Sequence, residues 1–388
     1  MVDILMIKSF KCNGWMMNPH DLVRPPLKGL PKTVHGGQGW RLPGVEDYSH
    51  NLNPFGPPDI ISMLISASGG IGHYPDDDCA DLKSVIAERY KVEKENIIVG
   101  SGSSDIIRMF PNTFLEPKDK VVISRPSFAE YSHQCKIVGA NIVDNLLLDL
   151  DEFRINYDKL MQLVSKGVKA VYICNPNNPT GRIEPREKIL SFVEWCAKKN
   201  VLVFLDETLL ELVPNCDDIS CARFVNEYPN LLVAGSLTKS FAIPGIRIGF
   251  GFGSKEIIEE MDKVRMTWNV GQIEQTVAKI LIRDHMDYVH RAAEIMAKEA
   301  KWMFDKLKDI GFPVSSPTDS YFFFNSLLPL EIDGAEFVDR LKANKYLVRD
   351  CASFGKPFDW YVRFCVKDHD RNVGFVNAVE ETLKSLRW

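Results

Sequence analysis

The residues best suited to chemistry in this sequence lie in a short segment near residue 240. Ser236, Thr238 and Lys239 follow an apolar run, and Arg247 comes shortly after them. A single lysine in such a position is usually a solvated charge at the start of a helix. Here two hydroxyls and a guanidinium accompany the amine, and together they could bind a phosphate beside a lysine that forms a Schiff base. The segment is therefore a candidate phosphate site next to a nucleophilic amine.

Two further polar segments come directly after apolar runs. The turn Asn175–Gly181 (NPNNPTG) follows the run 168–174, and Asp206 follows the run 201–205. Both segments also have a purely structural interpretation, as a rigid Pro/Asn/Gly turn and as a carboxylate that caps a turn. Ligands of open α/β sheets nevertheless bind at the carboxyl ends of parallel strands, where both segments are expected to lie. A buried aspartate there could face a pyridinium nitrogen, which an electron-sink cofactor requires.

A glycine-rich loop, Gly100–Asp105 (GSGSSD), lies between a strand-like run at 97–99 and a helical pattern over 106–110. Small residues at a helix N-terminus can bind an anion through backbone N–H groups and the helix dipole. A capped helix start would have the same residues. The loop is not the full dinucleotide fingerprint, because Asp105 stands where the third glycine would be. It is therefore a second candidate anion site.

Apolar runs that alternate with amphipathic stretches must position these groups. From residue 83 onward the pattern is typical of βαβ units, which predicts an α/β fold whose large domain has a mostly parallel central sheet. The runs themselves show little alternation, as expected of strands that are covered on both faces. The expected strands are 120–124, 168–174, 201–205, 231–235 and 246–252, and the clearest helices are 184–199 and 255–266.

After about residue 280 the pattern changes and predicts a smaller α+β domain. Its expected elements are a long helix over 286–309, strands at 321–325 and 360–366, and helices over 335–343 and from residue 371. We expect four parts along the chain: an N-terminal arm (1–34), a segment that packs with the small domain (35–60), the large domain (61–280) and the small domain (281–388).

The composition is that of a soluble globular protein. Among 388 residues, 47 Lys and Arg stand against 52 Asp and Glu, and 45% of the residues are hydrophobic. The net charge of −5 argues against nucleic acid as a partner. Because no run approaches the roughly 18 apolar residues that span a bilayer, and no signal peptide is evident, we expect a cytoplasmic protein without a membrane partner. The nine cysteines lack C-x-x-C spacing, which predicts buried, reduced thiols and no metal site.

Several motifs together resemble those of fold type I pyridoxal-phosphate enzymes, over about residues 35–388. Within that class, HYPD at 73–76, CNPNNPTG at 174–181, SLTK at 236–239 and IPGIR at 243–247 are similar to the histidinol-phosphate aminotransferases. Closer still is the resemblance to the threonine-phosphate decarboxylases of cobalamin biosynthesis. It rests on HGG at 35–37, DYSHNLNPFGPP at 47–58, RPSFAEY at 125–131 and LVRDC at 347–351.

The resemblance implies pyridoxal 5'-phosphate as the cofactor and assigns residues to it. Lys239 is the Schiff-base lysine, and Asp206 pairs with the pyridine nitrogen. Asn178 bonds the phenolic oxygen, and Tyr131 stacks on the ring, whose protonated nitrogen withdraws electrons from Cα. The residues implied at the cofactor phosphate are Ser103, Ser104, Ser236, Thr238, Arg247 and, from the neighbouring subunit of a homodimer with shared active sites, Tyr74.

The resemblance also implies a small phosphorylated amino acid as the substrate. Arg363 corresponds to the carboxylate-binding arginine, and Arg349 with His35 would hold the substrate phosphate. Gly36 belongs to the same motif, and Asn51 would approach the substrate or the Arg363 pair. Arginine suits both tasks because its planar fork binds carboxylate or phosphate bidentately. Binding of the substrate at both ends, by Arg363 and by Arg349 with His35, could turn its carboxylate out of the cofactor plane. This orientation favours decarboxylation of L-threonine O-3-phosphate to (R)-1-amino-2-propanol O-2-phosphate.

Other functions share parts of this pattern. A histidinol-phosphate-type aminotransferase has the same fold and cofactor, but Leu209 stands where that group has a tyrosine. A preference for L-serine O-phosphate stays open, because residues 207–211 differ from the usual pocket wall. The intact Lys239, Asp206 and Asn178 argue against a non-catalytic member. The incomplete glycine fingerprint argues against a nicotinamide-dependent dehydrogenase.

Overall fold

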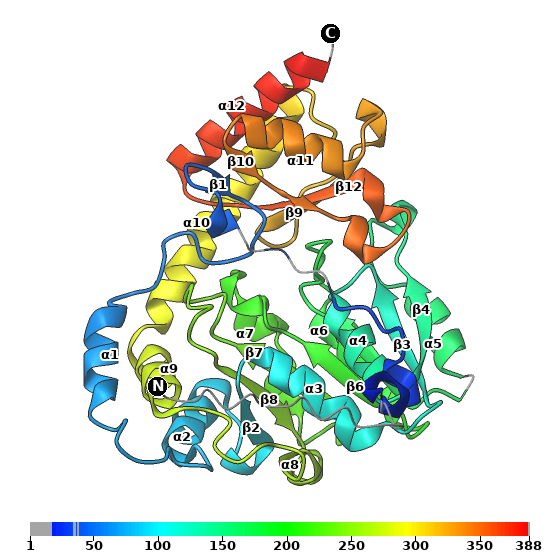
Figure 1. Ribbon diagram of the computed structural model, residues 1–388, viewed down its shortest axis with the longest axis vertical. Helices are drawn as coiled ribbons and strands as arrows, with labels where there is room; N and C mark the ends of the chain where they lie inside the picture. Colours follow the sequence, from blue (N-terminus) through cyan, green and yellow to red (C-terminus); the bar gives the residue numbers. More distant parts are fainter. Residues whose placement is uncertain (1–17, 34–35, 37–38, 166, 387–388) are drawn as a thin grey trace, which may run out of the picture.

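The protein folds into two lobes, and one long helix runs along both of them (Figure 1). The computed structural model describes residues 18–33, 36, 39–165 and 167–386. A seven-stranded sheet forms the centre of the lower lobe, and a three-stranded sheet lies in the upper lobe. The long helix, α10 (Met286–Asp309), packs against the turn 210–212 of the lower lobe and against α12 (His369–Leu386) of the upper lobe.

The large sheet has the strand order β2-β8-β7-β6-β5-β3-β4. All neighbouring strands are parallel except β8, which is antiparallel to both β2 and β7. The predicted α/β fold with a mostly parallel sheet is therefore confirmed. The strands are β2 (Ile97–Gly100), β3 (Lys120–Arg125), β4 (Asn141–Leu146), β5 (Ala170–Cys174), β6 (Leu202–Asp206), β7 (Leu231–Ser236) and β8 (Gly249–Gly253).

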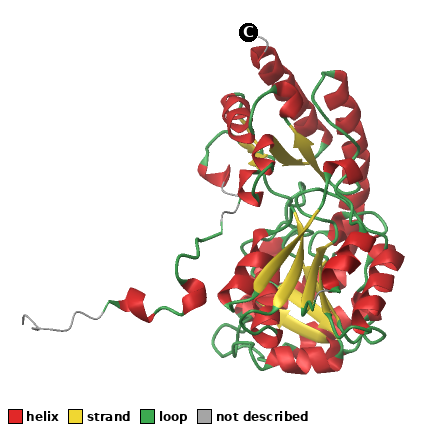
Figure 2. Ribbon diagram, turned by 90° about the vertical axis from the view of Figure 1, so that its right-hand side faces the viewer, coloured by secondary structure: helices red, strands yellow, loops and turns green. Residues whose placement is uncertain are grey.

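The central strands are buried because both of their faces are apolar. In β5, Val171 and Ile173 pack into one hydrophobic cluster, while Ala170 and Tyr172 pack into a second cluster on the opposite face. Figure 2 shows this sheet between helices on both sides. The helices of this lobe are α1 (Ile60–Ser68), α2 (Ala80–Tyr90), α3 (Ser103–Phe114), α4 (Ala129–Ile137), α5 (Tyr157–Val164), α6 (Arg186–Ala197), α7 (Cys216–Ile219), α8 (Lys255–Asp262) and α9 (Gln272–Asp284).

The upper lobe combines chain segments from both ends of the sequence. Its three-stranded sheet has the order β11-β12-β9, and β1 forms a separate parallel pair with β10. The sequence therefore enters the upper lobe once before residue 60 and again after α10. The remaining elements are β1 (Glu46–Asp47), β9 (Phe322–Ser326), α11 (Gly334–Ala343), β10 (Tyr346–Leu347), β11 (Arg349–Asp350) and β12 (Tyr361–Cys365).

The expected domain boundary at residue 281 falls inside α9. That helix packs against α1 and α2 of the lower lobe, so it does not belong to the small domain. His285 is the residue between α9 and α10. We therefore propose that the boundary lies at residue 285.

The N-terminal arm contacts α4 of the lower lobe between Arg24 and Thr33. Two short 3₁₀ turns, Pro19–Leu22 and Pro25–Leu27, lie at the side of the molecule (Figure 2). The Arg24 guanidinium donates to the carbonyl oxygen of Ile137 (3.3 Å), and the Thr33 hydroxyl donates to Glu130 Oε1 (2.5 Å). Residues 1–17 and 34 of the predicted arm lie outside the described residues.

Two predictions about composition can be compared with the structure. The eight cysteines within the described residues are free and buried, as expected of reduced thiols, and Cys12 lies outside that part of the chain. Throughout the described residues, every helix is either too short or too polar to cross a membrane.

Candidate active site

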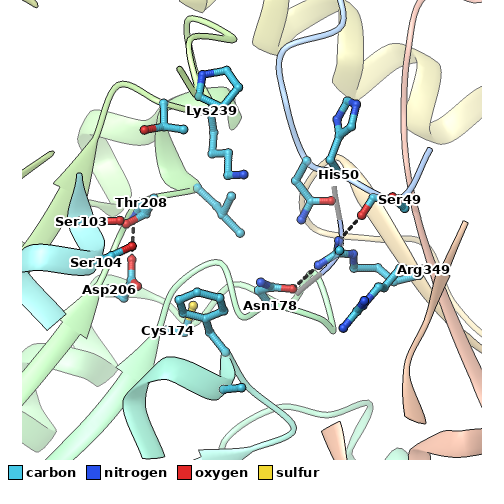
Figure 3. Close-up of a pocket in the computed structure, with 18 of the residues that line it drawn as sticks. Ser49, His50, Ser103, Ser104, Cys174, Asn178, Asp206, Thr208, Lys239 and Arg349 are labelled. Atoms are coloured by element: carbon cyan, nitrogen blue, oxygen red, sulfur yellow. Dashed lines mark hydrogen bonds between the residues drawn. The ribbon is translucent and has the colours of Figure 1, made fainter. Parts of the chain in front are cut away.

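A cavity of about 310 Å³ lies between the carboxyl ends of the central strands and the upper lobe (Figure 3). It brings together most of the residues that the sequence predicted for the site. Ser236 and Tyr74 do not line it, and His35 lies outside the described residues. The predicted residues that line the cavity are Gly36, Asn51, Ser103, Ser104, Tyr131, Asn178, Asp206, Thr238, Lys239, Arg247, Arg349 and Arg363.

The register of the parallel strands explains why these groups meet. Cys174 at the end of β5 pairs with Asp206 at the end of β6, and Asp206 pairs in turn with Ala234 of β7. The loops that follow these strands therefore leave the sheet at one edge, as ligand-binding loops of open α/β sheets do. They carry Asn178 and Lys239 to the two sides of Asp206.

Asp206 is a buried carboxylate with two donors of its own. The hydroxyl of Tyr131 donates to Oδ2 (2.6 Å), and the backbone N–H of Thr208 donates to Oδ1 (2.8 Å). Burial raises the pKa of Asp206, and these hydrogen bonds act against that rise. A protonated ring nitrogen beside Asp206 would supply the positive charge that favours the ionised carboxylate.

The structure places Tyr131 differently from the predicted ring-stacking position. Its side chain is almost fully buried, it stacks on Tyr172 with ring centroids 5.5 Å apart, and its hydroxyl is bound to Asp206. Phe128, three residues earlier, is only partly buried and lines the same cavity. We therefore propose that Phe128 stacks on the cofactor ring and that Tyr131 positions Asp206.

Lys239 extends its amine into the cavity (Figure 3). The loop that carries it is held by Asn53, whose backbone N–H donates to the carbonyl oxygen of Lys239 (2.9 Å) and whose amide donates to that of Ser240 (2.8 Å). Burial, together with the charges of Arg363 and Arg247, lowers the pKa of Lys239 to about 8. The amine is thus prepared to act as a nucleophile near neutral pH.

This lowered pKa gives a testable pH dependence. Only the neutral amine attacks a carbonyl, so the rate at which cofactor-free protein takes up pyridoxal phosphate should rise with pH through about 8 and then level off. Stopped-flow absorbance over a pH series measures this rate. Arg363→Gln removes a nearby positive charge and should move the midpoint to higher pH. A wild-type midpoint near that of an ordinary lysine would contradict the assignment.

The predicted phosphate site is formed by the glycine loop and Arg247. Ser103 and Ser104 begin α3, and Gly102 precedes them with φ of +80°. A Cβ at Gly102 would clash with Arg247 Nη2, and one at Gly249 would clash with the backbone nitrogen of Ser103. Only glycine at these two positions lets the loop, the guanidinium and β8 approach so closely. The result is a helix N-terminus with an adjacent arginine, which suits a phosphate dianion.

Gly102→Ala should therefore weaken cofactor binding by about tenfold or more, through backbone strain at positive φ and displacement of Arg247. The dissociation constant of pyridoxal phosphate, measured by fluorescence titration of cofactor-free protein, would report this change. Gly245→Ala is a matched control, because a Cβ at Gly245 would meet nothing within 4 Å. Equal affinities in the two variants would argue against this phosphate site.

Two residues predicted at the cofactor phosphate lie elsewhere. The hydroxyl oxygen of Ser236 lies 2.9 Å from Thr238 Oγ1 and accepts from the Thr238 backbone N–H (3.1 Å), so Ser236 positions Thr238 from below the cavity. Tyr74 is 72% exposed and stacks on Trp268 with ring centroids 4.1 Å apart. Within one chain, Tyr74 therefore points to the molecular surface and away from the cavity.

The upper lobe contributes two arginines that face the cavity together. Arg349 of β11 lies directly opposite Arg363 of β12 in an antiparallel pair, so both side chains are on one face of the sheet. Arg363 donates to Asn178 Oδ1 and to the carbonyl oxygen of Ser49, and Arg349 Nη2 donates to Ser353 Oγ (2.6 Å). Burial lowers the pKa of Arg363, and the charge of Arg349 lowers it further.

Several groups in this part of the cavity have capacity for a ligand. Arg363 Nε and Asn51 Oδ1 are buried and have no hydrogen-bond partner among the described residues. A Cβ at Gly36 would lie 3.2 Å from Arg349 Cδ, so the glycine lets the chain pass close to this guanidinium. The predicted substrate residues Gly36, Asn51, Arg349 and Arg363 thus lie together beside Asn178.

The sequence prediction missed other residues that line the cavity. His50 is the most notable: burial lowers its pKa, its Nδ1 has no partner among the described residues, and its Nε2 lies 4.0 Å from Asp47 Oδ2. Thr208 also lines the cavity beside Asp206, and its hydroxyl has no partner among the described residues. Both stand next to predicted residues, so their sequence neighbours were the available signal.

The charges of the cavity favour anionic ligands. Among the described residues that line it are four basic side chains and one carboxylate: Lys239, Arg247, Arg349 and Arg363 against Asp206. Asp206 and Lys239 suit the ring and carbonyl of pyridoxal phosphate, and the glycine loop with Arg247 suits its phosphate. Arg349 and Arg363 line the same cavity and suit the anionic groups of a substrate. The residues present therefore fit this cofactor.

The fold and the site define the class of protein. A family model described as "Aminotransferase class I and II" matches residues 44–378, and the chain belongs to this family. A histidinol-phosphate aminotransferase of Ruminiclostridium cellulolyticum is 34% identical over 265 residues, which cover 67% of this chain and 72% of that protein. A protein of Caldanaerobacter subterraneus provisionally named threonine-phosphate decarboxylase is 30% identical over 329 residues, which cover 85% of this chain and 88% of that protein.

Solved structures agree with this membership. The histidinol-phosphate aminotransferase of Clostridium acetobutylicum has a TM-score of 0.79 and 29% identity, over 87% of this chain and 99% of that one. The Sinorhizobium meliloti enzyme of the same name, in complex with pyridoxal-5'-phosphate, shares the fold with a TM-score of 0.82 over 94% of this chain, at 22% identity. The predictions of a fold type I enzyme and of pyridoxal phosphate as its cofactor are confirmed.

Proposed function

We propose that this protein decarboxylates L-threonine O-3-phosphate to (R)-1-amino-2-propanol O-2-phosphate, a reaction of cobalamin biosynthesis. The observation that carries the proposal is the pair Arg349 and Arg363, which lie in register and face the cavity that contains Lys239. A phosphorylated amino acid has two anionic groups, and each guanidinium can bind one of them bidentately. The 30% identity to a protein provisionally named threonine-phosphate decarboxylase supports the same substrate.

Each residue of the site has a task in this reaction. Bound pyridoxal phosphate supplies an electron sink for the bond that breaks at the substrate Cα. Asp206 keeps a proton on the ring nitrogen, and Tyr131 and Thr208 fix the direction of its carboxylate. Asn178 receives a hydrogen bond from Arg363 at Oδ1, which leaves its amide N–H groups free to donate to the cofactor. Lys239 can deliver a proton to Cα from the cavity wall.

The orientation of the substrate selects the bond that breaks. The bond at Cα that breaks most easily is the one perpendicular to the cofactor ring, because it overlaps with the π system that takes up the developing negative charge. With its carboxylate at Arg363 and its phosphate at Arg349, the substrate is held at both ends and can present the Cα–carboxylate bond in that direction. Binding energy from the remote phosphate then favours carbon dioxide loss over proton abstraction.

The proposal is tested by incubating the holoenzyme with L-threonine O-3-phosphate, with and without 2-oxoglutarate. Carbon dioxide and the amino alcohol phosphate should form at equal rates in both reactions, because decarboxylation needs no amino acceptor. L-serine O-phosphate, offered in parallel, measures the preference for the side-chain methyl group. Formation of glutamate without carbon dioxide would overturn the proposal.

A histidinol-phosphate aminotransferase is the second candidate function, and one observation favours it. Proteins with that name are frequent among the similar relatives, including those of Ruminiclostridium cellulolyticum and Moorella thermoacetica. Against it, Leu209 lines the cavity where this group has a tyrosine, so a phenolic donor to the cofactor oxygen is missing. Glutamate formed from histidinol phosphate and 2-oxoglutarate would identify this activity.

We also propose that the enzyme is a homodimer in which Tyr74 reaches the cofactor phosphate of the neighbouring subunit. The ring of Tyr74 is exposed, and large apolar side chains are exposed nearby in the sequence: Ile61, Ile65 and Ile71. Such exposed apolar groups are typical of a surface that another chain covers. Light scattering gives the mass in solution, and the mass of a single chain would contradict this assembly.

A further inference from the structure

Three side chains with metal-binding atoms meet outside the cavity described above. Glu211 lies in the 3₁₀ turn Leu210–Leu212, Cys216 begins α7, and His290 lies near the start of α10. One ligand atom from each side chain lies within 4.8 Å of the others. We propose that these residues form a zinc site, which does not depend on the substrate proposed for the active site.

The carboxylate of Glu211 is already oriented for such a role. The hydroxyl of Tyr90 donates to Glu211 Oε1 (2.5 Å), which fixes the carboxylate, and Oε2 is the oxygen that faces Cys216 Sγ at 3.9 Å. Metal ligands in proteins are commonly held by such outer hydrogen bonds. Tyr90 therefore acts as a positioning residue for one of the three ligands.

The surrounding charges favour a cation. Glu207 and Asp217 lie with Glu211 and Cys216 around one small cavity. Arg89 donates to Asp217 Oδ1 (2.8 Å) and also to Glu211 Oε2 (3.5 Å), so a metal at Glu211 would compete with the longer of these two hydrogen bonds. The Glu211 carboxylate lies 3.9 Å from Cys216 Sγ and would repel a thiolate there. A divalent cation would relieve this repulsion and stabilise the thiolate.

The small cavity, which Glu211 and Cys216 line and His290 does not, has room for a water molecule beside two of the three ligands. Its volume is about 20 Å³, and Tyr90 and Ser220 line it together with the carboxylates. A volume above roughly 10–15 Å³ can hold one water molecule. Zinc bound by three protein side chains commonly takes a water as its fourth ligand. Sulfur, nitrogen and oxygen donors in one site suit zinc better than magnesium or calcium, which prefer oxygen alone.

A metal here would connect two parts of the molecule that pack against each other. His290 belongs to α10, which runs along both lobes (Figure 1). Glu211 and Cys216 belong to the segment that follows Asp206 of the active site. Zinc would therefore hold α10 to the segment beside the catalytic carboxylate.

The site is tested by equilibrating chelator-treated holoenzyme with zinc chloride, removing free metal and measuring bound zinc by mass spectrometry. We expect one zinc per chain for the wild type. Cys216→Ser and His290→Gln should each lower the affinity, measured by competition with a chromogenic chelator, by about 100-fold or more. Cobalt in place of zinc should give the intense visible bands of a tetrahedral site with a thiolate ligand.

Matched controls separate this site from incidental binding. Cys196→Ser removes another buried thiol, and His285→Gln removes the histidine just before α10, and neither should change zinc affinity. Cofactor absorbance verifies that each variant is folded. If Cys216→Ser does not fold, His290→Gln decides alone, because His290 is the least buried of the three residues. No stoichiometric zinc in the wild type, or equal zinc affinity in His290→Gln, would overturn the proposal.

Discussion

Replacing Lys239 with alanine is expected to remove catalysis almost completely. In the proposed mechanism this side chain supplies both the amine that bonds the cofactor and the group that moves a proton at Cα, and its amine lies in the cavity with Asp206 and Asn178. Proton transfer by a positioned side chain alone contributes up to roughly 10⁴-fold to a rate, so we expect turnover to fall by about that factor or more. The absorbance band of lysine-bound pyridoxal phosphate should disappear at the same time.

The control for this variant is Lys255→Ala, which removes an exposed lysine at the start of α8. It should leave both the absorbance band and turnover unchanged. Lys239→Ala should still bind pyridoxal phosphate noncovalently, because the glycine loop and Arg247 are untouched. Persistence of the lysine-bound band in Lys239→Ala would remove the basis for the whole assignment of the site.

Replacing Arg349 with alanine should show which of the two anionic groups of the substrate this residue binds. If Arg349 binds the phosphate, KM for a phosphorylated substrate should rise by roughly 10- to 100-fold, the range expected for hydrogen bonds to a charged group. KM for the unphosphorylated analogue should change little. Steady-state kinetics with L-threonine O-3-phosphate and L-threonine measure both effects.

Arg363→Ala provides the contrast, because its guanidinium is assigned to the carboxylate that both substrates carry. We expect it to weaken both substrates to a similar degree, and also to release Asn178 from its hydrogen bond. Arg349→Lys keeps the charge but loses the planar fork, so we expect a rise in KM for the phosphorylated substrate that is smaller than in Arg349→Ala. If Arg349→Ala weakened both substrates equally, its role at the phosphate would be wrong.

The fold could largely be predicted because the central strands and α10 carry strong local patterns. The predicted helix over 286–309 agrees with α10 at both ends, and the apolar runs at 120–124 and 231–235 correspond to β3 and β7. β4 (Asn141–Leu146) was not predicted, because it lies at the sheet edge and its residues are mostly polar or partly exposed. Edge strands bury fewer side chains, so their sequences carry a weaker signal.

The candidate site was predictable where residue type determines the role. Asp206 and Lys239 end up in one cavity because parallel strands end at one edge, which the strand pattern already implies. The proposed exchange of Tyr131 for Phe128 as the ring that stacks on the cofactor could not be predicted, because the two aromatic residues belong to one motif. Only the turn into α4 decides which ring is buried. Likewise, the sequence shows no sign that Arg349 and Arg363 are register partners.

The pairing of β1 with β10 has a consequence for the order in which the protein is made. The backbone N–H of Tyr48 donates to Leu347, and that of Cys365 donates to Tyr48, so the segment leading to Asn51 is held by the last quarter of the chain. The ribosome releases that segment early, but its partners emerge only near the end of synthesis. We therefore expect a nascent chain to complete the sheet around Asp206 first and to acquire the substrate-binding wall last.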